Sequence, residues 1–208
     1  MNVNKNSYAG KTVLLANDID LNNMPWTPIG QTGATEFKGT FDGQGNTIKN
    51  LYVDSSAQTG EYYSSALFGW IESHGQDITI KNVNVDGATV IGYHNVAVIA
   101  GYMEGDSVVE NCNVTNATLK NTHANDGACG DKTGVIAGYV AGEVMVKGCT
   151  AIDCTVIGGR DAGQLIGASY VVPVDSSATN VTVSATGDCT GANIANELVG
   201  RKLGSAWN

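Results

Sequence analysis

The sequence predicts an all-β fold in which the chain winds as a solenoid of about five to six turns. Three observations predict it: a repeat with a period near 30 residues, alternation of apolar and polar residues inside each repeat, and a composition rich in glycine. The 208 residues include 27 glycines and three prolines. Hydrophobic residues make up 42% of the chain and charged residues 15%, which is typical of a domain with a core rather than of a disordered segment.

The repeat consists of two phrases that keep the same order along the chain. One phrase ends a short apolar run on a glycine, as in ALFG, VIAG, VIAG, QLIG and ELVG, and its glycines are Gly69, Gly101, Gly138, Gly167 and Gly200. The other phrase, IKNVNV at residues 80–85, has marker positions Asn50, Asn82, Asn111, Gly148 and Asn180. Self-similarity with a period of roughly 20–50 residues indicates stacked repeats.

Inside one repeat the pattern is that of strands. The stretch ITIKNVNVDGATVIG at residues 78–92 alternates apolar and polar residues in short runs broken by Asn, Asp and Gly. Three short strands and three bends fill about 30 residues, which is one turn of a parallel β-helix with turns ~4.8 Å apart. Aligning the markers predicts two inward columns. They are Leu51, Val83, Cys112, Cys149 and Val181, and Val53, Val85, Val114, Ala151 and Val183.

The cysteines fit this core. Cys112, Cys149 and Cys154 fall at inward positions, where a cysteine packs as a small hydrophobe. A Cys112–Cys149 disulfide would have a poor torsion angle because the two Cβ vectors are parallel, so free thiols are favoured over a bridge. The spacing of the cysteines matches no zinc signature, and we expect no metal site. Cys129 lies in the longest insertion and is expected to be exposed.

The ends of the chain differ from the middle. Residues 1–45 lack the repeat and are predicted to form an N-terminal cap and an entry turn, while residues 46–208 carry the repeats of the same single domain. Nothing comparable caps the other end. Either more chain follows in the native protein, or Leu203 and Trp207 fold back over the last turn.

Charge and hydropathy restrict the partners. Eleven basic against twenty acidic residues give a net charge of −9, which disfavours binding to nucleic acids and to anionic lipid. No apolar run approaches the ~18 residues of a membrane helix, so we expect no membrane insertion within this segment. The start, MNVNKNSYAG, lacks the apolar core of a secretory signal. The chain is therefore either cytosolic or a piece of a longer protein.

The opening KTVLLANDIDL, with WTPIG and FKGTFDGQGNTIKNL after it, resembles the start of GLUG-motif regions in bacterial surface proteins. The repeated VIAGY phrases resemble the GLUG repeat itself, whose leading glycine is present here only as Gly134 and Gly163. The resemblance covers residues 8–200. It implies a right-handed parallel β-helix, an extracellular or cell-surface location, an adhesin-like role within a longer parent chain, and no catalytic residues in the repeat.

Aromatic residues follow the glycine in three repeats. Alternation would place Leu67, Ile99, Ile136, Leu165 and Leu198 inward and Phe68 outward, beside a column that contains Trp70, Tyr102 and Tyr139. Exposed aromatic patches bind partners, so Phe68, Trp70, Tyr102 and Tyr139 are the predicted platform for a glycan or a host surface protein. Two alternatives remain open: the loops at residues 55–64 or 121–132 cover the patch, or the strand phase is reversed.

Catalysis is not expected. The acids Asp86, Glu110 and Asp153 are scattered, whereas a glycosidase needs two carboxylates across a cleft. His74, His94 and His123 stand in predicted turns, and no phrase around them indicates a catalytic triad or a cofactor. The expected function is a non-catalytic surface module that binds a glycan or a protein. A rigid spacer is the alternative, and a polysaccharide-degrading enzyme is less favoured.

Overall fold

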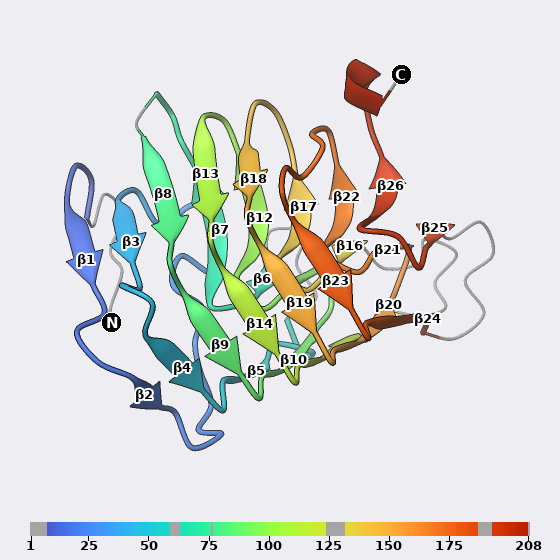
Figure 1. Cartoon of the computed structure of the whole chain (residues 1–208), viewed down its shortest axis with the longest axis horizontal. Helices are drawn as coiled ribbons and strands as arrows, with labels where there is room; N and C mark the ends of the chain where they lie inside the picture. Colours follow the sequence, from blue (N-terminus) through green and yellow to red (C-terminus); the bar gives the residue numbers. More distant parts are fainter. Residues whose placement is uncertain (1–7, 59–62, 76, 124–131, 187–192, 208) are drawn as a thin grey trace.

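The computed structural model describes residues 8–58, 63–75, 77–123, 132–186 and 193–207. Within them the strands form five sheets, and neighbouring strands in these sheets are parallel. The chain passes through the sheets in the same order on each turn, so the stack grows steadily from the N-terminal to the C-terminal end (Figure 1). The predicted all-β, parallel, β-helix-like stack is confirmed at this level.

Each sheet is named after its strand in the turn that starts at Thr40. The β3 sheet contains β1 (Thr12–Leu14), β3 (Thr40–Asp42), β8 (Ile78–Lys81), β13 (Ser107–Glu110) and β18 (Met145–Lys147). The β4 sheet contains β2 (Ile19–Asp20), β4 (Thr47–Lys49), β9 (Asn84–Asp86), β14 (Asn113–Thr115), β19 (Thr150–Ile152) and β23 (Ser177–Thr179). The β5 sheet contains β5 (Tyr52–Asp54), β10 (Thr89–Gly92), β15 (Thr118–Asn121), β20 (Thr155–Gly158) and β24 (Thr182–Ala185).

The other two sheets carry the glycine phrase. The β6 sheet contains β6 (Ser64–Ser65), β11 (Asn95–Val96), β16 (Lys132–Thr133), β21 (Asp161–Ala162) and β25 (Asn193–Ile194). The β7 sheet contains β7 (Phe68–Glu72), β12 (Ala100–Glu104), β17 (Ala137–Val140), β22 (Ile166–Ser169) and β26 (Val199–Lys202). A single 3₁₀ turn, η1 (Ser205–Trp207), follows β26, and the described residues contain no α-helix.

The first turn is built from residues that lack the repeat. β1 pairs in register with β3, and β2 pairs with β4. Isolated bridges then join Pro25 to Tyr52, Ile29 to Phe68 and Phe37 to Ile71. Residues 8–45 thus add strands and bridges to the same sheets.

The core columns follow the predicted spacing in the middle of the chain but not at its ends. Val83, Cys112 and Cys149 are adjacent, as expected, and so are Val85, Val114 and Ala151. Leu51, however, lies beside Ala88, and Val181 lies beside Cys154. Likewise, Val53 pairs with Val90, and Val183 with Val156. The predicted membership of both columns is therefore wrong at the first and last repeats.

A short period inside the turn explains this slip. Ile80, Val85 and Val90 point inward and are spaced five residues apart. Asn82 lies at a bend two positions after Ile80, and Gly87 lies at a bend two positions after Val85. The phrase at residues 48–53 therefore matches residues 80–85 and residues 85–90 about equally well. The observed strand pairing corresponds to the alignment with residues 85–90, because Ile48 pairs with Val85 and Val53 with Val90.

The asparagines at the bends adopt left-handed backbone conformations. The φ angles are 56° at Asn50, 53° at Asn82 and 51° at Asn111, and Gly148 has 62°. Asparagine and glycine tolerate this region better than other residues. The side chains add bonds along the stack: the Nδ2 of Asn82 donates to Asp42 Oδ1 at 3.0 Å, and the Nδ2 of Asn50 donates to Asp20 Oδ1 at 2.8 Å.

The described cysteines belong to the core. Cys112, Cys149 and Cys154 are buried and free, as the sequence predicted. A hydrogen bond between the thiols of Cys112 and Cys149, followed by burial, raises the pKa of the Cys112 thiol well above its usual value. Cys129, expected to be exposed, lies outside the described residues.

Candidate functional site

The glycine phrase places one predicted platform residue in the core. Phe68 is 0% exposed, and its ring lies 5.2 Å from that of Phe37 and 5.3 Å from that of Phe41, between ring centroids. Leu67 is buried as well. Both neighbours point inward because Leu67 lies in the bend before β7, where strict alternation does not hold. The expectation that the Phe68 column faces outward is wrong.

The glycine itself is required by a close approach between successive turns. A Cβ atom built on Gly101 would lie 2.4 Å from Cβ of Ser64, and one on Gly138 would lie 2.6 Å from the carbonyl oxygen of Gly101. Real Cβ atoms do not approach so closely. A side chain at Gly101 would push β12 away from β6 of the preceding turn, and one at Gly138 would push β17 away from β12. The repeated glycine thus has a structural cause.

The aromatic column predicted from the sequence exists. Trp70, Tyr102 and Tyr139 occupy equivalent positions on β7, β12 and β17, and they are paired in register. The rings of Trp70 and Tyr102 are stacked, with centroids 3.8 Å apart and an interplanar angle of 13°. Tyr102 and Tyr139 are tilted at 5.4 Å, and Tyr170 continues the column at 6.5 Å from Tyr139. We call these four residues the aromatic column.

Exposure rises along the aromatic column. Trp70 is only 8% exposed, Tyr102 and Tyr139 are half-buried, and Tyr170 is 41% exposed. Part of the cover over Trp70 comes from the entry turn, because a Cβ built on Gly33 would lie 3.3 Å from Cε2 of its ring. The sequence had proposed the loops at 55–64 and 121–132 as cover, and much of each lies outside the described residues.

Carboxylates accept hydrogen bonds from the polar groups of the two rings at the buried end of the aromatic column. The indole Nε1 of Trp70 donates to Oε2 of Glu72 at 3.0 Å, and the hydroxyl of Tyr102 donates to Oε2 of Glu104 at 2.6 Å. Burial, followed by this bond to Glu104, raises the pKa of Tyr102 far above its usual value. Burial and the neighbouring Tyr170 raise the pKa of Tyr139 to about 12. Both phenols are therefore neutral at physiological pH.

Further ionisable side chains lie beside the buried end of the aromatic column. Nε2 of His74 lies 3.5 Å from Oε1 of Glu36 and 3.4 Å from Oε1 of Glu72. Glu36 is 3% exposed and pairs with Nζ of Lys38 at 2.9 Å. Burial, the largest single effect, opposes the ionised form of Glu36. The hydrogen bond from Lys38, a backbone hydrogen bond and the charge of Lys38 together outweigh it, so the pKa of Glu36 is lowered.

The other residues considered for catalysis lie in separate places. Asp86 is on β9, where its Oδ1 accepts bonds from Thr115 and Asn116 of the next turn. Glu110 is on β13 in a different sheet. His94 and His123 come together, with ring centroids 5.5 Å apart, and both are nearly buried. The described residues contain no group of three or more His, Cys, Asp or Glu arranged to hold a metal ion.

A groove that was not predicted from the sequence lies on the N-terminal side of the stack. It has a volume of about 520 Å³ and lies between residues 25–31 and the end of β5, with Trp26, Gln31, Tyr52, Asp54 and Gln58 on its surface. Trp26 is half-buried, and its Nε1 donates to the carbonyl of Leu67 at 3.3 Å. One signal was available: Tyr52 stands where the other turns carry Thr89, Thr118, Thr155 and Thr182.

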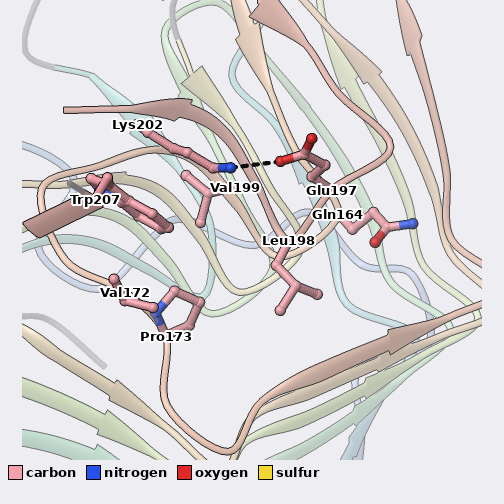
Figure 2. A pocket seen from close by; sticks show the side chains of 8 residues that line it. All are labelled: Gln164, Val172, Pro173, Glu197, Leu198, Val199, Lys202 and Trp207. Atoms are coloured by element: carbon pink, nitrogen blue, oxygen red, sulfur yellow. Dashed lines mark hydrogen bonds and ion pairs between the residues drawn. The ribbon is translucent and has the colours of Figure 1, made fainter.

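A second cavity, of about 400 Å³, lies at the C-terminal end of the stack (Figure 2). Val172, Pro173 and Leu198 form its apolar part, and Lys202 pairs with Glu197 at 2.8 Å beside it. Trp207 lies on its rim, donating through Nε1 to the carbonyl of Ser169 at 3.2 Å. Trp207 packs against the core, whereas Leu203 is not among the described residues that do, so the fold-back named as one alternative for this end is present for Trp207 alone.

No helix in the described part of the chain is long and apolar enough to cross a membrane.

Comparison with protein-family models, with curated proteins and with solved structures finds no match to this chain.

Proposed function

We propose that this chain is a non-catalytic binding module of a bacterial cell-surface protein, of the GLUG kind, which takes a glycan or a protein partner on its outer surface. The observation that supports this is the aromatic column, in which Trp70, Tyr102 and Tyr139 occupy one equivalent position of successive turns and Tyr170 follows from the next turn. A ligand laid along the stack would meet several rings at once. Tyr139 and Tyr170 form the accessible part, and Lys132 lies 5.0 Å above the Tyr139 ring.

The proposal includes a right-handed winding. Connections between parallel strands of one sheet are right-handed in roughly 98% of cases, and each turn here is such a connection. It also includes an extracellular location and a longer parent chain, which rest on the sequence resemblance.

An array of glycans, mucins and host surface proteins, probed with the labelled chain, tests the proposal. We expect saturable binding that Tyr139→Ala weakens and that Thr118→Ala, an exposed change on the β5 sheet, leaves unaltered. Absence of binding to every glycan, mucin and protein on the array would overturn the binding function. Release of new reducing ends from any bound glycan would contradict its non-catalytic character.

A rigid spacer is the second candidate, and one observation favours it. The faces of Trp70 and Tyr102 are stacked on each other, so a sugar ring cannot stack between them. If the whole column serves only to hold the turns together, the chain will bind nothing on the array, and substitutions in the column will change stability alone.

A further inference from the structure

We infer that the groove between Trp26 and Tyr52 is a binding site for a neutral saccharide. This inference rests on the proposed function and deepens it, because it names a site and a ligand class. The groove is distinct from the aromatic column, and its volume of about 520 Å³ lies within the ~300–1,000 Å³ of small-molecule sites.

The two rings of the groove are available in a way that the buried end of the aromatic column is not. Within the described residues neither Trp26 nor Tyr52 stacks on another aromatic ring, whereas Trp70 stacks on Tyr102. The bond from the Trp26 indole to the Leu67 carbonyl fixes that ring against the core. An aromatic ring with one face on the core and a polar tip is suited to pack against the C–H face of a sugar.

The stack does not require an aromatic residue at the position of Tyr52. The equivalent residues of the next four turns are threonines, paired in register with it and with one another. A threonine at position 52 would therefore continue the β5 sheet without change. Tyr52 is a departure from the repeat, and it occurs where the chain also forms a groove.

The groove is held rigid by its backbone. Pro25 and Pro28, two of the three prolines in the chain, flank Trp26 and restrict the backbone there. The backbone N–H of Trp26 donates to the carbonyl of Tyr52 at 2.8 Å, which joins the two walls. On the other wall, Oδ1 of Asp54 accepts bonds from the N–H of Ser56 at 3.0 Å and from its hydroxyl at 2.6 Å. A pre-formed site loses less conformational entropy on binding.

The polar groups of the groove match hydroxyls. Among the described residues, Oδ2 of Asp54 accepts only a long hydrogen bond from the Tyr52 hydroxyl, at 3.5 Å, so this oxygen is largely available. The side-chain amides of Gln31 and Gln58 make no hydrogen bond to the described residues. A carboxylate that accepts and amides that both donate and accept can satisfy several sugar hydroxyls together.

The charge of the groove selects against anionic ligands. Hydrogen bonds from the Ser56 side chain and backbone lower the pKa of Asp54, so its carboxylate is ionised at neutral pH. No Lys, Arg or His is among the described residues that line the groove. A uronic acid or a sulfated sugar would meet this carboxylate with no cation to compensate, and the net charge of −9 adds to the repulsion.

Titration with defined oligosaccharides tests the inference. The probes are tetra- to hexasaccharides of glucose, mannose, galactose and xylose, with oligogalacturonate as the acidic counterpart, and binding is followed by calorimetry and by the NMR signal of the Trp26 indole N–H. We expect a neutral probe to bind and to shift that signal, and we expect Tyr52→Thr to weaken its affinity about tenfold or more. Thermal unfolding of Tyr52→Thr should match the parent chain. Thr118→Ala, an exposed change at the equivalent position of another turn and outside both the groove and the aromatic column, serves as the matched control.

The outcomes separate this inference from the proposed function. Binding that Tyr52→Thr leaves unchanged but Tyr139→Ala or Tyr170→Ala weakens would overturn the groove and keep the binding module. Equal or tighter binding of oligogalacturonate would overturn the assignment to neutral sugars. Binding of none of the probes would overturn the groove as a site for these saccharides, while the array with mucins and host proteins would still decide the proposed function.

Discussion

Replacing Trp70 with alanine should destabilise the fold. The indole is 8% exposed, stacks on Tyr102 at 3.8 Å, packs against the backbone at Gly33 and donates to Glu72. Truncating a buried tryptophan to alanine costs about 3–5 kcal/mol, a large part of the ~5–15 kcal/mol that stabilises a typical domain. We therefore expect the free energy of unfolding of Trp70→Ala to fall by about 3–5 kcal/mol.

Two companion variants separate the contributions. Trp70→Phe retains a ring on Tyr102 but loses the bond to Glu72, and we expect it to cost about 1–2 kcal/mol. Tyr139→Ala removes a ring that is half-buried and only tilted against its neighbour, and it should cost about 1 kcal/mol. The order Trp70→Ala, then Trp70→Phe, then Tyr139→Ala follows from burial, stacking and the bond to Glu72.

Urea unfolding followed by far-UV circular dichroism measures these differences. The m-value should be the same for all four chains, because a change in it would mean that the turns no longer unfold together. A loss below about 1 kcal/mol for Trp70→Ala would refute the reasoning. If Trp70→Ala also abolished ligand binding, Trp70 would be an exposed binding residue, as predicted from the sequence.

Three further predictions concern the bends, the carboxylates and the cysteines. Asn111 has a φ of 51°, so Asn111→Ala should lower the free energy of unfolding by about 1–2 kcal/mol. Asn111→Gly should lower it clearly less in the same urea assay, because glycine tolerates this backbone conformation. Equal effects of the two substitutions would contradict a backbone cause. Bonds from Asn116 and Thr115 lower the pKa of Asp86, so its contribution is complete above the unfolded value of ~3.9 and disappears as pH falls through the folded value. The stability difference between the parent chain and Asp86→Asn should accordingly vanish towards pH ~2, and a difference that persists there would exclude this linkage. Cys112, Cys149 and Cys154 should react with iodoacetamide only after unfolding, as seen by mass spectrometry of their peptides, and a native Cys112–Cys149 disulfide would contradict the free, buried thiols.

The architecture could be predicted from the sequence because stacking imposes the same packing constraints on every turn. Buried positions such as Val85, Val114 and Ala151 must be apolar in each turn, and the close approach at Gly101 and Gly138 admits only glycine. These constraints recur at a fixed interval, so they are visible without any knowledge of the contacts. The buried, unbridged cysteines followed from the same columns.

The register at the ends could not be predicted, for a physical reason. The turn contains its own five-residue period, so shifting Ile48 from Val85 to Ile80 keeps apolar residues inside and asparagine at a bend. Only hydrogen bonding along the whole stack distinguishes the two alignments. Inward and outward faces were misassigned at Phe68 for a similar reason, since a bend ends the alternation on which that assignment depended.

The candidate site was only partly visible in the sequence. Equivalent positions brought Trp70, Tyr102 and Tyr139 together as expected, but their exposure depends on the entry turn at Gly33, which carries no repeat. One wall of the groove, which carries Trp26, belongs to the same irregular segment. Residues outside the repeat have no equivalent in other turns, so their contacts cannot be inferred by alignment.

The in-register stack is tested most directly by methyl–methyl nuclear Overhauser effects in a sample with labelled Ile and Val side chains. The pairing of β4 with β9 and of β9 with β14 predicts contacts from Ile48 to Val85 and from Val85 to Val114. Contacts from Ile48 to Ile80, with none to Val85, would contradict the arrangement of turns on which the groove, the aromatic column and the buried cysteines all depend.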